Sequence, residues 1–191
     1  MKVFIDTYGC AKNEYDSSVL AASLEERGCS IVYDALEADA LILNTCGFIE
    51  DAKKESIDRL FELIELRGED KKLIVTGCLS ERYHKELAEE LPEVDMFFGV
   101  NDYDDIPDIL LSDTDKDSSD MVGCVLDCLP YRKRNYDLIE EDPYYGYRKI
   151  AEGCYNACSF CAIPGIRGTF RSKKMEDCVR EAEDMAAAGI K

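Results

Sequence analysis

The sequence has few of the features that would place it in a membrane or outside the cell. No stretch approaches the roughly 20 consecutive apolar residues that a membrane-spanning helix needs. The first residues also lack a signal-peptide pattern, because Asp6 interrupts their short apolar run. These two absences predict a protein of the reducing cytoplasm that has no membrane partner.

Histidine and basic residues are also scarce. His84 is the single histidine, which leaves little material for a mixed cysteine and histidine zinc site. Lys and Arg number 23 against 41 Asp and Glu, and residues 1–143 hold all of the excess acidity. An acidic surface repels phosphate backbones, so we expect this chain to bind nucleic acid poorly. The acidity would attract a basic protein, or it only keeps the chain in solution.

Cysteine, in contrast, is abundant, with ten residues in a chain of 191. This length suffices for one ordinary domain and part of another. In a reducing compartment so many cysteines indicate metal or redox chemistry rather than disulfides.

The first candidate site is a C-x3-C-x2-C array formed by Cys154, Cys158 and Cys161. It follows residues 145–152, which have the composition of a strand, so the array lies in a loop. Three thiolates this close can hold one four-iron cluster and leave one iron open. Structural zinc prefers four ligands in paired groups, and three cysteines cannot all form disulfides. The spacing therefore favours an iron–sulfur cluster over these two alternatives.

The rest of the chain alternates between strand and helix patterns. Short apolar runs predict strands at 2–8, 29–33, 38–43, 72–76 and 95–99. Apolar spacing and capping residues predict helices at about 13–27, 49–66, 80–90, 101–111 and 176–188. This alternation predicts an α/β fold with a doubly wound parallel sheet. A polar loop at 112–120 and a short strand within 121–143 are expected to follow it.

The second candidate site is formed by Cys10, Cys46 and Cys78, which stand at or just past the ends of three predicted strands. The carboxyl ends of parallel strands meet at one edge of a sheet, where ligands bind. Converging thiolates there could form a second three-cysteine cluster site. The alternative is that these are ordinary buried cysteines, although the glycine beside each of them favours close approach to a bound group.

The residues around the first array carry a resemblance to a known family. Residues 158–172 read CSFCAIPGIRGTFRS, which resembles the methylthiotransferase branch of the radical S-adenosylmethionine (SAM) superfamily. The resemblance implies that Cys154, Cys158 and Cys161 hold a four-iron four-sulfur (4Fe-4S) cluster. It also implies that SAM chelates the open iron, with Phe160 lying beside the adenine.

The family resemblance further implies a second 4Fe-4S cluster on Cys10, Cys46 and Cys78. The implied enzyme is a transferase that converts C–H into C–S–CH3, using a SAM-derived radical, sulfur supplied at the second cluster and a methyl group from another SAM. An electron donor such as flavodoxin or ferredoxin would act as a partner.

Three further segments resemble the branch that modifies the β-carbon of an aspartate in ribosomal small-subunit protein twelve. They are residues 44–57, 76–83 and 92–99. We therefore expect a ribosomal protein as the substrate. The alternatives are a methylthiotransferase acting on a tRNA adenosine and a non-catalytic iron–sulfur fragment.

The resemblance also suggests how the chain is divided. We expect a cluster-binding domain at 1–126, a linker at 127–143 and the first β/α unit of a truncated radical SAM partial barrel at 144–191. Because the family continues with more β/α units and a small β-rich domain, we expect this piece alone to be inactive.

Several other residues have less specific patterns. Cys124 and Cys128 lack a nearby partner pair, so we interpret them as core or surface thiols, and Cys178 as an ordinary helix residue. Residues 132–134 form a basic spot that we interpret as a solvated turn, with an anion or domain contact as the alternative. Arg167 and Arg171 either neutralise cluster thiolates or bind the SAM carboxylate, or they lie in a solvated turn.

Overall fold

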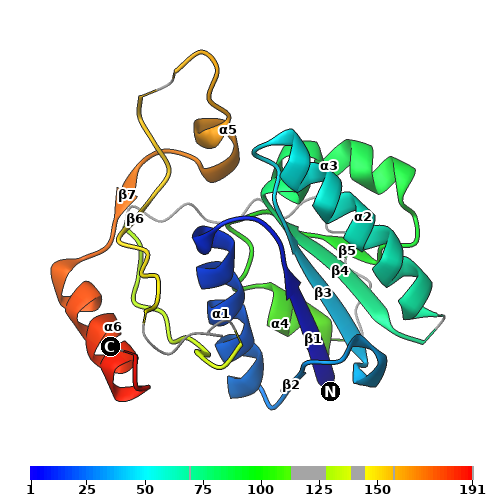
Figure 1. The fold of residues 1–191 in the computed structure, drawn as a ribbon, viewed down its shortest axis with the longest axis horizontal. Helices are drawn as coiled ribbons and strands as arrows, with labels where there is room; N and C mark the ends of the chain where they lie inside the picture. The colour runs from blue at the N-terminus through cyan, green and yellow to red at the C-terminus, as the bar shows by residue number, and fades with distance from the viewer. Residues whose placement is uncertain (69, 113–127, 139–144, 157, 191) are drawn as a thin grey trace.

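The protein contains an open parallel sheet with helices on both faces (Figure 1). The computed structural model describes residues 1–68, 70–112, 128–138, 145–156 and 158–190. The five strands are β1 (Lys2–Thr7), β2 (Ser30–Val32), β3 (Ala40–Thr45), β4 (Lys72–Gly77) and β5 (Met96–Phe97). They pair in parallel in the order β2-β1-β3-β4-β5, which confirms the predicted α/β fold with a parallel sheet.

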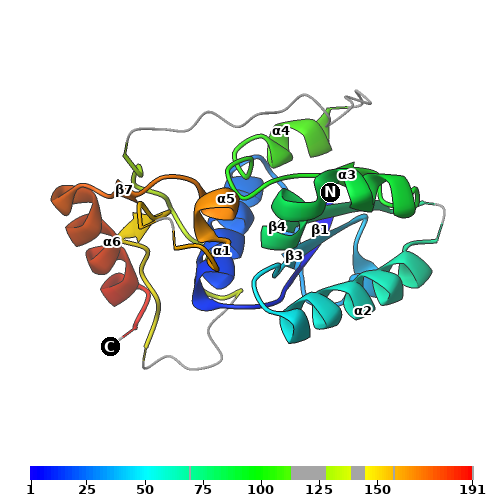
Figure 2. The same cartoon turned by 90° about the horizontal axis from the view of Figure 1, so that it is seen from above.

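Two hydrophobic cores, one on each face of the sheet, explain why the strand sequences are almost wholly apolar. Ile42 points into the core shared with α1 (Ala11–Glu26) and α4 (Ile106–Leu111). Leu41 and Leu43 point into the opposite core. There they meet α2 (Glu50–Arg67), and α3 (Cys78–Glu90) packs its Leu87 against the same core. Figure 2 shows α1 and α4 on the opposite side of the strands from α2.

The C-terminal part lies against α1, on the side of that helix away from the sheet (Figure 1). It contains β6 (Ala151–Glu152), α5 (Ile163–Arg167), β7 (Arg171–Ser172) and α6 (Met175–Ala187), and β6 pairs antiparallel with β7. Because α1 is covered on two sides, ten of its sixteen residues are buried, several of them polar. The helix therefore carries side chains that connect the two parts of the chain.

Some predicted boundaries were wrong. The strand expected at 145–152 is reduced to Ala151–Glu152, the two residues that pair with β7. The helix expected from residue 101 begins at Ile106, after a hydrogen-bonded turn, and a short 3-10 helix at Ala35–Glu37 was not foreseen.

Other predictions fall largely on residues that the structure does not describe. Of the short strand expected within 121–143, only residues 128–138 are described, and they contain an isolated parallel bridge between Leu129 and Lys173. The loop at 112–120 and the domain boundaries near residues 126 and 143 likewise fall on or beside undescribed residues, so the domain division stays a prediction. Among the described residues, no helix combines the length and apolar character required to cross a membrane.

Candidate metal centre

The cysteines of the second candidate site stand at the carboxyl edge of the sheet. Cys46 directly follows β3, and Cys78 opens α3 directly after β4. Cys10 is the N-cap residue of α1, just beyond β1. Since β1, β3 and β4 are neighbours, the three residues share one edge. The order in which successive strands are added to the sheet reverses between β1 and β3, and open α/β sheets bind ligands at such a switch point.

Two glycines allow these loops to approach one another closely. A Cβ on Gly9 would lie 2.6 Å from Cys46 Cβ and 2.9 Å from its Sγ. A Cβ on Gly77 would collide with the backbone of Thr45. Their φ angles of +112° and +101° are also ones that other residues rarely adopt. Glycine is therefore required for this edge to be as compact as it is.

The side chain of Asn13 connects the loop after β1 with the loop after β3. Its Nδ2 donates to Tyr8 O at 2.7 Å and to Thr45 O at 3.0 Å. The backbone N–H of Cys46 donates to Ser56 Oγ at 3.0 Å. These bonds satisfy buried backbone groups that leave the sheet ladder, and they fix the positions from which the cysteine side chains extend.

The three sulfur atoms differ in their surroundings. Cys46 and Cys78 are buried, whereas Cys10 is exposed. Burial raises the pKa of the Cys78 thiol, and the nearby charge and hydrogen bond of Arg167 offset part of that rise. No three Cys, His, Asp or Glu side chains in the described ranges surround a common point as metal ligands do. The sheet topology thus brings the three loops together, while their role as a ligand set stays a prediction.

The first candidate site occupies the loop between β6 and α5. The backbone N–H of Cys154 donates to Gly168 O at 3.1 Å, which closes the loop at its base. Cys158 is exposed, while Cys154 and Cys161 are half-buried. Phe160 is 90% exposed, so its ring packs on little of the described protein. An aromatic side chain displayed in this way is available to stack on a planar ligand.

Arg167, at the end of α5, connects the two candidate sites. Its Nη2 donates to Cys78 Sγ at 3.2 Å and to Asn13 Oδ1 at 2.7 Å. Its Nη1 donates to Asp16 and Glu152, both at 2.9 Å. The side chain is almost completely buried. The segment that follows the first cysteine loop therefore reaches a cysteine of the second group.

The charges around Arg167 stabilise one another. Burial alone would lower the pKa of Arg167, but Asp16, Cys78 and Glu152 raise it well above its usual value. Burial would likewise raise the pKa of Glu152, but Lys149 and Arg167 outweigh that effect and hold it far below its usual value. Lys149 also forms an ion pair with Asp16. Arg167 and Glu152 thus stay charged within the interior at neutral pH.

A second buried cluster surrounds Tyr15 of α1. Its hydroxyl donates to Glu181 of α6 at 2.9 Å and accepts a hydrogen bond from Lys173 at 2.8 Å. The guanidinium of Arg134 lies 4.7 Å from the centre of the Tyr15 ring. Arg134 also donates to Ser18 Oγ at 2.7 Å. These contacts fasten α6 and the segment around residue 134 to α1.

Sequence reasoning missed most of this network. The solvated turn expected at residues 132–134 was wrong for Arg134, which is buried, and for Arg132, which pairs with Asp104, whereas Lys133 is exposed. The same alternative was wrong for Arg167 and Arg171, which are both buried. The concentration of basic residues at 144–191 in an otherwise acidic chain could have indicated that some of these arginines are buried against acidic partners.

The structure describes three of the cysteines outside the two candidate sites, and Cys128 and Cys178 agree with their interpretation as ordinary thiols. Cys178 is a buried residue of α6, Cys29 is buried directly before β2, and Cys128 is half-buried. None of these three is disulfide-bonded. Cys124 lies outside the described residues.

The fold and its sheet-edge cysteines define the class: an open α/β protein with thiols at the ligand-binding edge of a parallel sheet. A family model described as "Uncharacterized protein family UPF0004" matches residues 2–99, about half of the chain. The chain belongs to this family.

Curated relatives match over nearly the whole chain. Proteins named ribosomal protein uS12 methylthiotransferase RimO are 47% identical in Thermoanaerobacter sp., 46% in Syntrophus aciditrophicus and 44% in Thermotoga maritima. The matches cover 99%, 99% and 100% of this chain but 43% of each relative. The chain therefore spans less than half the length of these relatives. The matches agree with the predicted resemblance to the methylthiotransferases.

A solved structure shares the fold. It is described as the cobalamin-dependent SAM radical enzyme OxsB with aqua-cobalamin and SAM bound. It aligns with a TM-score of 0.53 at 13% identity, covering 98% of this chain and 32% of the other. At this identity the similarity concerns the fold alone.

Proposed function

We propose that the chain forms part of a radical SAM methylthiotransferase that acts on the β-carbon of an aspartate in ribosomal small-subunit protein twelve. The observation that carries the proposal is the contact of Arg167 with Cys78. It connects the loop of the first cysteine group to the second group, and sulfur insertion requires two such centres side by side. The printed names of the relatives support the ribosomal substrate over tRNA.

The donor chemistry of both groups fits a 4Fe-4S cluster. Each group supplies three thiols, which is one fewer than the irons of such a cluster. We propose that one cluster is held by Cys154, Cys158 and Cys161, with Phe160 beside the adenine of SAM, and the other by Cys10, Cys46 and Cys78. When bound, the clusters and SAM supply the electron, the radical and the sulfur that an unactivated C–H bond requires.

The chain's own residues contribute placement and charge. Arg167 orients the Cys78 sulfur and places a buried positive charge beside thiolates that would otherwise repel one another. Asn13 holds the backbone on which two of the cysteine loops rest. An electron donor such as flavodoxin or ferredoxin would complete the reaction. We expect the chain alone to be inactive, because it spans less than half the length of the relatives.

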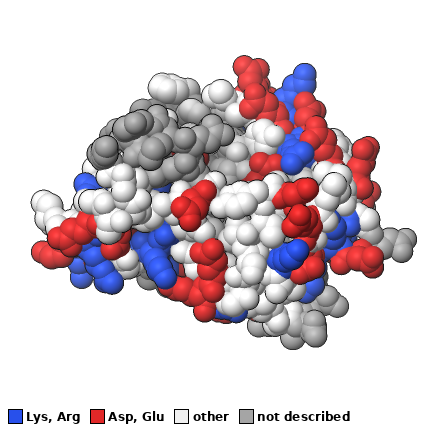
Figure 3. Space-filling model, turned by 60° about the horizontal axis from the view of Figure 1, so that its bottom comes forward, with Lys and Arg blue, Asp and Glu red and all other residues white. Residues whose placement is uncertain are grey.

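The surface is compatible with a basic protein as the substrate. The formal net charge of −18 favours approach of a positively charged partner. On the face drawn in Figure 3, the described basic side chains lie among acidic ones and form no continuous basic patch. The net acidity supports a protein substrate over an RNA, whose backbone needs a basic surface.

Metal analysis after anaerobic reconstitution tests the two cluster sites. We expect about eight irons per chain for two 4Fe-4S clusters. Changing either cysteine trio to alanine should remove about half of the iron, while a Cys29→Ala/Cys128→Ala control should keep all of it. Zinc in place of iron, or a single cluster in the unchanged chain, would contradict the assignment.

Addition of SAM separates an enzyme from a passive iron–sulfur protein. In the variant that lacks Cys10, Cys46 and Cys78, the electron paramagnetic resonance spectrum of the reduced protein should change when SAM is added. If the spectrum does not change when SAM is added, the result would support a non-catalytic iron–sulfur protein instead of an enzyme.

The substrate is tested in a strain from which the gene is deleted. Mass spectrometry should show loss of the methylthio group from the aspartate of ribosomal protein twelve, with tRNA methylthiolation unchanged. The opposite result would assign the tRNA branch.

A further inference from the structure

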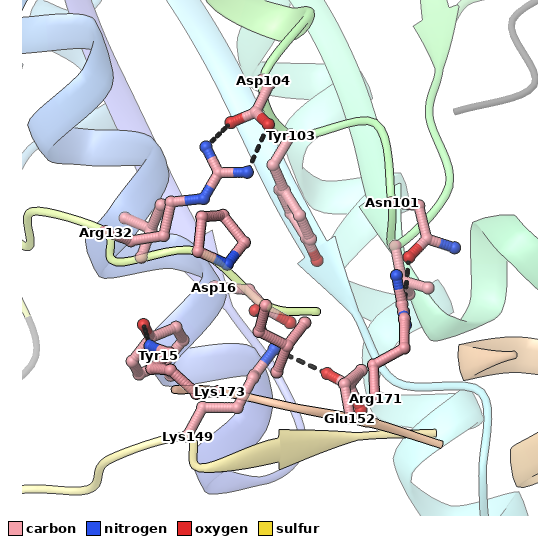
Figure 4. A pocket seen from close by; sticks show the side chains of 14 residues that line it. Tyr15, Asp16, Asn101, Tyr103, Asp104, Arg132, Lys149, Glu152, Arg171 and Lys173 are labelled. Carbon is pink, nitrogen blue, oxygen red and sulfur yellow. Dashed lines mark hydrogen bonds and ion pairs between the residues drawn. The ribbon is translucent and has the colours of Figure 1, made fainter. Parts of the chain in front are cut away.

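A small cavity separates α1 from the C-terminal strands (Figure 4). Its volume is about 110 Å³. The walls come from α1, from residues 100–104 before α4, from residues 129–132, and from the region of β6 and β7. The cysteine groups do not line it.

Most charged groups on its walls are neutralised by the protein itself. Lys149 forms ion pairs with Asp16 and Glu152. Arg132 pairs with Asp104. Lys173, which also lines the cavity, pairs with Glu181. These cations therefore need no further anion.

Arg171 is the exception. Its side chain lines the cavity and only 7% of the residue is exposed. Its Nη2 donates to Asn101 Oδ1 at 3.0 Å and to Arg167 O at 3.3 Å, and both acceptors are uncharged. Its buried Nε has no hydrogen-bond partner in the part of the chain that the structure describes. A buried guanidinium without an anion is costly, so the site favours one.

The carboxylate that lies opposite Arg171 on the paired strand β6 already binds other cations. Glu152 lies opposite Arg171 in the β6–β7 pair, but its oxygens bind Lys12, Lys149 and Arg167. Arg171 is thus the one cation of the wall that has no carboxylate partner among the described residues. A single unpaired positive charge suits a monoanion better than a doubly charged phosphate.

The shape and polarity of the cavity further restrict which monoanions can bind in it. Val19, Val100, Leu129 and Pro130 supply an apolar part of the wall. A guanidinium forms charge-assisted hydrogen bonds with a carboxylate. We propose that this cavity binds a short aliphatic carboxylate, with its charged end on the guanidinium of Arg171 and its alkyl part against the apolar wall. None of the proposed cluster ligands lines this site.

The test follows binding to the metal-free, reduced 191-residue chain by nuclear magnetic resonance. Propionate is titrated at constant ionic strength, with propionamide as a neutral molecule of the same shape. The Arg171 Nε–H and the Asn101 side-chain amide are the reporters. We expect saturable shifts with propionate and none with propionamide. Equal effects of the two molecules, or no saturable shift, would overturn the proposal.

Substitutions of Arg171 test whether its positive charge binds the carboxylate. Arg171→Gln should weaken propionate binding at least tenfold, and Arg171→Lys should weaken it less because the charge remains. Arg27→Gln, which alters an exposed pair with Asp108, is the matched control and should bind as the unchanged chain does. Unchanged affinity in a folded Arg171→Gln variant would refute the assignment. If that variant does not fold, the comparison of propionate with propionamide decides.

A final arm identifies the source of the carboxylate. A blocked dipeptide that contains glutamate is compared with its glutamine counterpart. Binding of the glutamate peptide would indicate an acidic side chain from a polypeptide. Binding of free propionate alone would indicate a small free acid. Failure of both would overturn the site.

Discussion

Replacing Arg167 by glutamine would remove the central cation of the buried network while keeping much of the side-chain volume. The side chain is 2% exposed and contacts Asp16 and Glu152, each 6% exposed, at 2.9 Å. Removing one partner of a buried ion pair costs about 3–5 kcal/mol. Lys149 remains beside both carboxylates, so we expect a loss near the lower end, about 3 kcal/mol. Typical domains have only about 5–15 kcal/mol of stability in total.

Urea unfolding of the metal-free chain, followed by circular dichroism, measures this loss. Arg27→Gln breaks a partly exposed ion pair with Asp108 and should cost less than about 1 kcal/mol. In the Asp16→Asn/Arg167→Gln double variant, the loss should be smaller than the sum of the single losses by about 1–3 kcal/mol. A loss below about 1 kcal/mol for Arg167→Gln, or additive losses, would show that the network does not hold the two parts together.

Three further predictions follow from the same geometry. Gly77→Ala should lower the unfolding free energy by at least about 2 kcal/mol, because of the positive φ of Gly77 and the collision of the new Cβ with Thr45. In Gly68→Ala the new Cβ meets nothing within 4 Å, so this control should lower the unfolding free energy less. Equal losses for the two variants in urea unfolding would refute the packing argument. The lowered pKa of Glu152 makes its stabilisation fully present above its unfolded value of about 4.3 and lost as pH falls below it. Glu152→Gln should therefore flatten the acid limb of stability against pH, and an unchanged limb would contradict this. Burial and the hydrogen bond to Asp184 raise the pKa of Tyr131 to about 12. Asp184→Asn should lower it, as measured by carbon-13 resonance of the tyrosine ring, and no change would exclude that hydrogen bond as a cause.

Local patterns in the sequence determined the sheet and its edge. Runs such as Leu41–Leu43 are apolar at every position because β3 is buried on both faces, and only a central parallel strand has that environment. The parallel arrangement then requires the residues after β1, β3 and β4 to meet at one edge of the sheet. The sequence alone could therefore predict that Cys10, Cys46 and Cys78 lie at the same edge.

Tertiary structure alone decided what surrounds those cysteines. Arg167 lies 89 residues from Cys78 and 151 from Asp16 along the chain. No periodicity or capping rule connects positions so far apart, and a basic residue after a loop is by default solvated. Its burial follows from the packing of the C-terminal segment on α1, which uses both sides of one helix. The same packing leaves Arg171 inside without a carboxylate partner in the described part of the chain, a property that only the assembled molecule has.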